Sequence, residues 1–241
     1  MKEWFQKFGH HWKVLLCDHA FKVSLFVGVC LLMGAYLVNY YASTYNDVSE
    51  YLSVGDLILD NIPTYNMEFF FTWFMYFMMV MLFVYPIFFE PEIVPFALKT
   101  FSLLIYFRAG FILLTNIGPP DGFYYDGTQV GGNFIADLMF RNDLFFSGHT
   151  AYPFLAFLIF KNTRLRWFFL VGAIIEGITV LMMHVHYSID VFAAFFIVFG
   201  VYSASEAIFK KLNSRFREKL EKYGWVAWKK MKVLAHGSHK R

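Results

Sequence analysis

The sequence Ser147-Gly148-His149-Thr150 stands at the start of one apolar run, and His186-Tyr187-Ser188-Ile189-Asp190 stands at the start of another. Two histidines can divide a phosphoryl transfer between them, one attacking phosphorus and the other handling the proton of the alcohol. Asp190 follows His186 by four residues, so from the first turn of a helix it can hold the far nitrogen of that imidazole. These two motifs predict where the chain places its chemistry.

The composition is that of a membrane protein. The chain is 58% hydrophobic and 16% charged, whereas soluble domains carry about a quarter charged residues. Its 241 residues suffice for one domain of about six membrane helices. Cys17 and Cys30 support neither a disulfide framework nor a zinc site, and we expect no metal and no other cofactor. We predict an all-α polytopic protein with six transmembrane helices, at residues 21–41, 69–89, 95–117, 147–160, 167–183 and 189–209.

The basic residues predict the orientation in the membrane. Of the 21 Lys and Arg, 19 fall at the two ends of the chain, in the loop 161–166 or at Lys99, and only Arg108 and Arg141 lie on the other side. By the positive-inside rule both termini are cytoplasmic. Both histidine motifs then lie at the non-cytoplasmic face. No Asn-x-Ser/Thr sequon occurs, which favours a bacterial inner membrane.

We divide the chain into three parts. Residues 1–22 form a basic amphipathic segment on the cytoplasmic side, without the cleavage site of a removable signal peptide. Residues 23–209 form the six-helix catalytic domain. Residues 210–241 form a basic amphipathic tail, expected to lie on the anionic inner leaflet rather than to bind nucleic acid. The sequence does not indicate an oligomeric state.

Residues 147–149 have the chemistry of a phosphate site. Ser147 can cap the fourth span, and Gly148 allows a bulky headgroup to approach the backbone. The fourth and sixth spans would both point their positive N-terminal ends at one pocket, which favours phosphate. The alternative for His149 and His186 is interfacial packing or a satisfied hydrogen bond, but ionisable groups near membrane depth are usually functional.

Two further ionisable residues fall inside predicted spans. Arg108 lies about two turns, at ~1.5 Å per residue, from the outer end of the third span. It is a candidate phosphate ligand, with a structural ion pair or snorkelling as the alternative. Glu176 lies ten residues before His186, and the sequence leaves open whether it pairs with a base or keeps a proton.

The motifs resemble the type-2 phosphatidic acid phosphatase superfamily, and more closely its sphingomyelin synthase branch. That branch carries Gly-Asp-x-x-x-Ser-Gly-His-Thr, and residues 142–150 here read Asn-Asp-Leu-Phe-Phe-Ser-Gly-His-Thr. It also carries His-x-His-Tyr-x-x-Asp-Val, and residues 184–191 read His-Val-His-Tyr-Ser-Ile-Asp-Val.

Weaker matches extend the resemblance over about residues 50–200. Arg108 is followed by Thr115, Pro119 and Pro120, as in an earlier pattern of the branch. Residues 55–63 resemble the motif of the first external loop, although Gly55 replaces the usual proline.

The resemblance implies a role for each matching residue. His186 would be the nucleophile, oriented by Asp190, and would form a phosphohistidine. His149 would protonate the departing diacylglycerol oxygen and then deprotonate the acceptor hydroxyl. Asp143 would contact a cationic headgroup, unless it is an ordinary loop aspartate. His184 and Tyr187 flank His186 and are further candidates for substrate binding.

One departure from the phosphatase branch bears on the substrate. That branch places Ser-Arg seven and six residues before its nucleophile, where this chain has Thr179 and Val180. A phosphomonoester dianion calls for several cationic donors, whereas a diester carries one negative charge and needs fewer. The missing arginine therefore favours a phospholipid diester.

We accordingly predict a phosphotransferase that moves a phosphorylated headgroup from a glycerophospholipid to a lipid alcohol, such as ceramide or diacylglycerol. A phosphatase of lipid phosphates or polyprenyl pyrophosphate, or phospholipase C-like hydrolysis, is the main alternative. A non-catalytic lipid-binding membrane protein is a weaker one, because all three catalytic candidates are present. Choline, ethanolamine and inositol headgroups all fit, while the external acids Asp56, Asp60 and Asp143 favour a cationic one.

Overall fold

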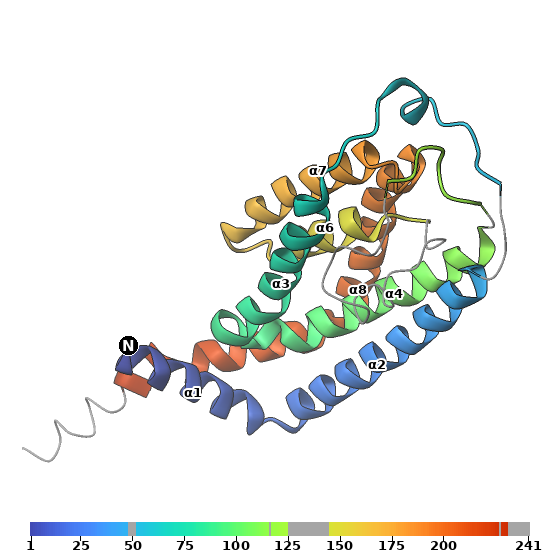
Figure 1. Ribbon diagram of the computed structural model, residues 1–241. Coiled ribbons are helices and arrows are strands. Elements are labelled where there is room, and N and C mark those ends of the chain that lie inside the picture. Colours follow the sequence, from blue (N-terminus) through green and yellow to red (C-terminus); the bar gives the residue numbers. More distant parts are fainter. Residues whose placement is uncertain (48–51, 116, 125–144, 227, 231–241) are drawn as a thin grey trace, which may run out of the picture.

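The computed structural model describes residues 1–47, 52–115, 117–124, 145–226 and 228–230. The regular structure in these ranges is helical, which confirms the all-α prediction for the described part of the chain (Figure 1). The helices are α1 (Lys2–Leu16), α2 (His19–Asp47), α3 (Met75–Phe89), α4 (Val94–Leu114), α6 (Gly148–Ile159), α7 (Leu165–Met182) and α8 (Ser188–Tyr223). A π-helical stretch, Phe69–Phe74, leads directly into α3, and short 3-10 turns lie at Leu59–Asn61 and Pro91–Ile93.

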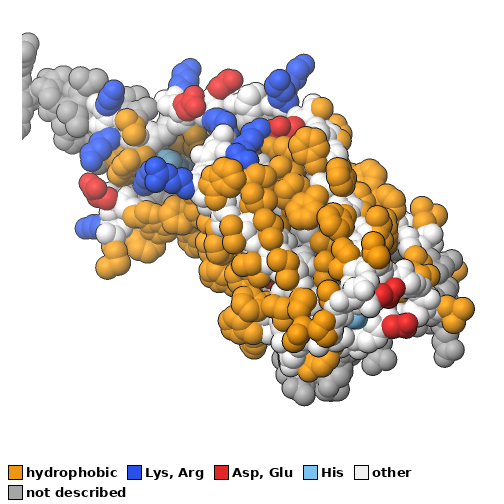
Figure 2. All heavy atoms as spheres, turned by 90° about the horizontal axis from the view of Figure 1, so that it is seen from above, with side chains coloured by type: hydrophobic (Ala, Val, Ile, Leu, Met, Phe, Trp, Pro, Cys, Tyr) orange, Lys and Arg blue, Asp and Glu red, His pale blue; other side chains and the backbone are white. Residues whose placement is uncertain are grey.

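Five stretches among the described residues are long and apolar enough to cross a membrane. They are His19–Tyr45, Phe69–Phe89, Pro91–Leu114, Leu165–Met182 and Ser188–Lys230. Hydrophobic side chains cover most of the face in Figure 2, while Lys and Arg gather toward the end that carries α1 in Figure 1. The chain is therefore a multi-pass membrane protein, and the location of its termini stays a prediction.

The fourth predicted span, residues 147–160, corresponds to a short enclosed helix. Helix α6 has 12 residues, which at ~1.5 Å per residue gives about 18 Å against a hydrocarbon thickness of ~30 Å. It packs against α7 and α8, and Ala151, Leu155 and Ala156 have no exposed surface. Among the described residues the structure thus supports five of the six predicted spans, and the sixth stays a prediction.

Helix α4 runs through the protein interior and is mostly buried. It pairs along its length with α2, where Gly28 leaves room for Leu98. Lys99, which the charge count treats as lying near the cytoplasmic end, is 4% exposed. Its ammonium donates to Ser24 Oγ at 2.7 Å and lies 4.1 Å from the centre of the Phe209 ring, so α2, α4 and α8 meet there.

The tail of α8 packs on the protein itself. Helix α8 continues without a break across residues 209 and 210. Phe216 is buried in a cluster with Leu15 and Phe21, whose partly buried members include Leu212 and Leu220. The apolar side of the predicted amphipathic tail thus packs against apolar residues of α1 and of the start of α2.

Candidate active site

The site forms where the N-termini of α6 and α8 meet. The Ser147 N–H donates to the Asp190 carbonyl at 3.2 Å, which joins the two helix starts. Ser147 Oγ accepts from the Thr150 N–H at 3.4 Å, which confirms the predicted cap. Helix α7 closes on both at Gly177, where a Cβ atom would lie 3.1 Å from Val191 and 3.4 Å from Thr150. The two sequence motifs therefore share one junction.

His186 and Asp190 lie side by side, as their spacing predicts. Asp190 Oδ2 is 3.4 Å from His186 Nδ1, and both side chains are almost fully buried. The two atoms lie within ion-pair distance but do not form a hydrogen bond, since His186 Nδ1 has no hydrogen-bond partner among the described residues. The same carboxylate oxygen accepts the Tyr187 N–H at 3.0 Å. Asp190 is thus held by the first turn of α8 with its charge beside the imidazole.

His149 is fixed by Phe71, a residue that the sequence did not single out. The two rings stack with centroids 4.1 Å apart and planes 17° apart. His149 Nε2 lies 3.1 Å from the Phe71 carbonyl oxygen. Because a carbonyl oxygen only accepts, Nε2 carries the proton of the neutral ring, and Nδ1 is left to exchange a proton. His149 is within electrostatic range of both His186 and Arg108.

Arg108 brings a permanent cation from α4 to this junction. Its side chain is 5% exposed, and Nε donates to the Phe146 carbonyl at 3.1 Å. The backbone of Gly148 is so near that a Cβ atom there would lie 3.6 Å from Arg108 Nε. A Cβ atom at Gly148 would also lie 3.3 Å from the Tyr152 ring, so glycine lets the backbone lie close to both side chains. The admission of a headgroup at Gly148 stays a prediction.

The N-terminus of α8 is not open to phosphate, contrary to the expectation that both helix ends serve the ligand. Asp56 Oδ2 accepts the Ser188 N–H at 2.7 Å and the Ser188 hydroxyl at 2.8 Å. The preceding N–H, of Tyr187, goes to Asp190. Protein carboxylates take these donors because the acidic loop that precedes α3 folds back onto the helix start. Asp56 was not among the predicted site residues.

Tyr187 and His184 hold loops rather than line the junction. The Tyr187 hydroxyl donates to the Gly118 carbonyl at 2.9 Å and accepts the Val54 N–H at 3.1 Å. His184 Nδ1 is 2.8 Å from the Asp121 carbonyl and Nε2 is 3.2 Å from that of Ile62. The polar atoms of both side chains therefore contact main-chain groups of the loops before α3 and after α4.

Two other candidates stand apart from this geometry. Asp143 lies outside the described residues. Glu176 is fully buried on α7, and neither of its carboxyl oxygens has a hydrogen-bond partner in the described part of the chain. No group of three or more His, Cys, Asp or Glu side chains suited to a metal occurs among the described residues.

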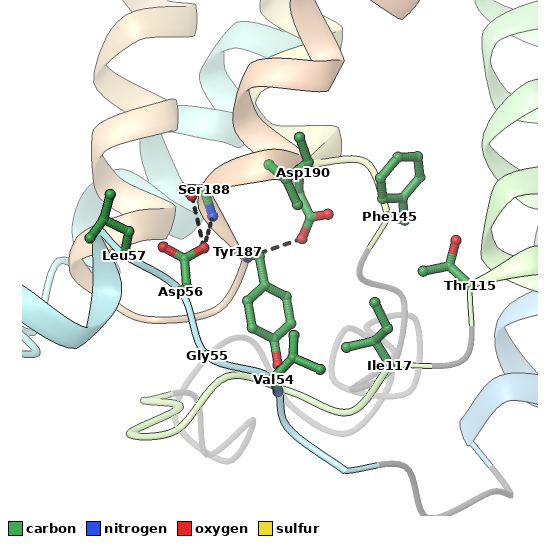
Figure 3. Close-up of a pocket in the computed structure, with 11 residues that line it drawn as sticks. Val54, Gly55, Asp56, Leu57, Thr115, Ile117, Phe145, Tyr187, Ser188 and Asp190 are labelled. Atoms are coloured by element: carbon green, nitrogen blue, oxygen red, sulfur yellow. Dashed lines mark hydrogen bonds between the residues drawn. The ribbon is translucent and has the colours of Figure 1, made fainter.

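A cavity of about 320 Å³ adjoins the site on its loop side (Figure 3). Apolar residues dominate its wall, including Leu57, Ile117, Phe145 and Ile189, while Asp190 lies at its inner end. His149, His186 and Arg108 are not among the residues that line it. The cavity thus reaches the Asp190 carboxylate beside His186 Nδ1, while neither histidine lines it.

Comparison with known proteins supports the superfamily to which the motifs point. A family model described as PAP2 superfamily C-terminal matches residues 142–207, a range that contains His149, His186 and Asp190. Members of this superfamily are generally enzymes that act on phosphate esters. No curated protein and no solved structure matches the chain. The class indicated is a membrane enzyme of phosphatase or phosphotransferase type acting on lipids.

Proposed function

We propose that the protein transfers a phosphorylated headgroup from a glycerophospholipid to a lipid alcohol, as sphingomyelin synthases do. The observation that carries the proposal is the meeting of His149, His186 and Arg108 at the junction of α6 and α8, with Asp190 beside the far nitrogen of His186. Such a site offers a nucleophile, a proton carrier and an anion ligand near one helix junction.

In the first half-reaction His186 Nε2 attacks phosphorus and the bond from phosphorus to the glycerol oxygen breaks. Asp190 beside Nδ1 favours the tautomer in which Nε2 holds the lone pair, and it stabilises the positive ring that forms. His149 enters this step as the imidazolium, with its Nε2–H held by the Phe71 carbonyl, and delivers its Nδ1 proton to the departing diacylglycerol oxygen. Arg108 balances charge on the phosphoryl oxygens. The products are diacylglycerol and a phosphohistidine that carries the headgroup.

In the second half-reaction His149 Nδ1 takes the proton of the acceptor hydroxyl. The acceptor oxygen then attacks phosphorus, and the bond from phosphorus to His186 Nε2 breaks. Both histidines return to their starting states, so the cycle needs no further reactant. The stacking on Phe71 holds His149 in one orientation for both proton transfers.

The surroundings of Val180 support a diester substrate. Val180 occupies the position where the phosphatase branch has an arginine, and here it is fully buried in an apolar cluster with Phe71, Met183, Val185 and Val191. A cation at this position would displace packed hydrocarbon. With Arg108 as the cation at the site, a singly charged diester is matched better than a dianion.

The test is headgroup transfer by the purified protein in mixed micelles. Donors labelled in the headgroup, namely phosphatidylcholine, phosphatidylethanolamine and phosphatidylinositol, are offered with ceramide or diacylglycerol, and a His186→Ala variant is run beside them. We expect label in a new lipid that disappears in the variant.

The second candidate is a lipid phosphatase, with which the family match is equally compatible. In that case water replaces the lipid acceptor in the second half-reaction. Label found only in water-soluble products, or inorganic phosphate released from phosphatidic acid alone, would refute the transferase and support hydrolysis.

A further inference from the structure

Asp56 ties the first external loop to the start of α8. Its Oδ1 atom accepts the N–H groups of Ile58 at 2.9 Å and Leu59 at 3.2 Å, within its own loop. Its Oδ2 atom accepts the N–H and the hydroxyl of Ser188 at 2.7 and 2.8 Å (Figure 3). A carboxylate offers about four lone-pair sites, so these four hydrogen bonds use its whole capacity.

Asp56 is therefore unsuited to bind a cationic headgroup, although its place in an acidic external loop favours that role from sequence. Burial works to raise the pKa of Asp56, but hydrogen bonds from Ser188, Leu59 and Ile58 outweigh burial and lower the pKa. The group is thus a carboxylate at neutral pH, and its charge lies at the positive end of α8, where anions are stabilised.

Ser188 lies between His186 and Asp190 in the chain, so the hydrogen bonds from Ser188 to Asp56 also affect the positions of these two residues. Asp190 Oδ2 takes the Tyr187 N–H at 3.0 Å and stays 3.4 Å from His186 Nδ1. The next N–H along the chain, that of Ser188, is already bonded to Asp56. Without Asp56, the Ser188 N–H would lose its acceptor, and the Asp190 carboxylate, which already holds the neighbouring Tyr187 N–H, would be drawn toward Ser188.

We propose that Asp56 is a positioning residue for the phosphoryl transfer: by bonding Ser188, it leaves the Asp190 carboxylate to His186. This rests on the proposed function, in which His186 is the nucleophile. Asp56 contacts neither the imidazole nor the substrate, and it acts through the first turn of α8. The position of the Asp190 carboxylate therefore depends on Asp56, which lies 132 positions before Ser188.

The test compares Asp56→Asn with Asp60→Asn, which removes the same charge four residues away in the same loop. Asp60 is exposed, and one of its carboxylate oxygens accepts the Asp56 N–H at 3.2 Å. The amide oxygen of an asparagine can accept the same hydrogen bond. Single-turnover formation of the phosphoenzyme is followed by rapid quench, giving a rate constant and an amplitude. A misplacement of about 1 Å at a reacting group costs roughly 100-fold, so we expect a 10- to 100-fold lower rate constant for Asp56→Asn.

A positioning role predicts that the amplitude and KM of Asp56→Asn stay within about threefold of the parent, as does the rate constant of Asp60→Asn. A merely structural role would instead lower the amplitude, since fewer molecules are folded, and leave the rate constant of the folded fraction unchanged. A lower amplitude with an unchanged rate constant in Asp56→Asn would overturn the proposal. Equal rate constants in the parent, Asp56→Asn and Asp60→Asn would overturn it too. Ser188→Ala removes one of the two hydrogen bonds and no charge, and should slow the same step about 3- to 10-fold.

Hydrogen exchange separates this proposal from the proposed function. In Asp56→Asn the N–H groups of Tyr187 and Ser188 should exchange at least tenfold faster, with exchange in α4 and α7 unchanged. If the parent protein forms no phosphoenzyme, the proposed function fails, while unchanged exchange at residues 187 and 188 refutes the positioning role by itself.

Discussion

The most direct perturbation of the site is Asp190→Asn. Asp190 Oδ2 both accepts the Tyr187 N–H and lies beside His186 Nδ1. An asparagine that places its carbonyl oxygen there keeps the contact with Tyr187 and the shape of the helix start. The substitution therefore removes the charge behind His186 and little else.

The size of the effect follows from the distance. Two unit charges 3.4 Å apart interact by about 5 kcal/mol at an effective dielectric constant of ~20. Since ~1.36 kcal/mol is a factor of ten in rate, that figure sets an upper limit of a few thousandfold. The contact lacks hydrogen-bond geometry, so we expect a loss of about 100- to 1,000-fold in kcat. The lost anion in the first turn of α8 should cost only about 0.3–1 kcal/mol of stability.

Transfer of headgroup label in mixed micelles measures kcat and KM, and thermal unfolding in the same detergent measures stability. Asp60→Asn is the matched control and should stay within about threefold of the parent. A loss below tenfold in Asp190→Asn, in protein that unfolds like the parent, would refute a carboxylate-supported nucleophile. A large loss confined to KM would refute it too, because the charge is expected to act on the transition state.

Three further predictions concern other parts of the molecule. His149→Asn should lower kcat by about 100- to 10,000-fold with little change in KM, and unchanged initial rates would exclude it as the proton carrier. Burial opposes the charge of Asp18, yet hydrogen bonds from Lys219, the Ala20 N–H and Arg215 outweigh burial and lower the pKa of Asp18 to about 2. The charged carboxylate therefore contributes about 2 kcal/mol of stability above pH ~4, and this contribution is lost as the pH falls from ~4 to ~2. The free energy of unfolding should thus depend less on pH over this range in Asp18→Asn, and an identical pH dependence would contradict this. Phe216→Ala should lower the free energy of unfolding by about 3–5 kcal/mol without changing kcat, and denaturant melts that match the parent would show that the cluster is not needed.

Sequence predicted the parts of the fold that depend on local composition. Apolar runs of about 20 residues mark the five long helices because a helix needs that length to cross hydrocarbon. The same criterion also predicted a span at residues 147–160, where α6 has 12 residues, so the sixth span stays a prediction. The basic amphipathic pattern of residues 210–241 predicts a helix on the inner leaflet. In the structure Phe216 packs on Leu15, and contact of the tail with lipid stays a prediction.

The site divides in the same way. The pairing of His186 with Asp190 is four residues apart on one helix, so spacing alone predicts it. The stacking of His149 on Phe71 joins residues 78 positions apart, and the Asp56–Ser188 contact joins residues 132 apart. No periodicity connects such positions, because they come together only when loops close onto helix ends. An acid in an external loop therefore predicts a ligand contact from sequence, yet in the structure Asp56 caps a helix.

The distribution of donors at the junction bears on the choice between a transferase and a phosphatase. The Tyr187 and Ser188 N–H groups of α8 bond to Asp190 and Asp56, so this helix end contributes little positive potential to a ligand. Position 180 is filled by a buried valine. Within the described part of the chain, Arg108 is the permanent cation that reaches Gly148. The buried Asp190 carboxylate already adds a negative charge at this junction, so the second negative charge of a phosphate dianion is harder to accommodate here than the single charge of a diester. This charge balance, rather than the two histidines that transferases and phosphatases share, favours transfer from a phospholipid diester.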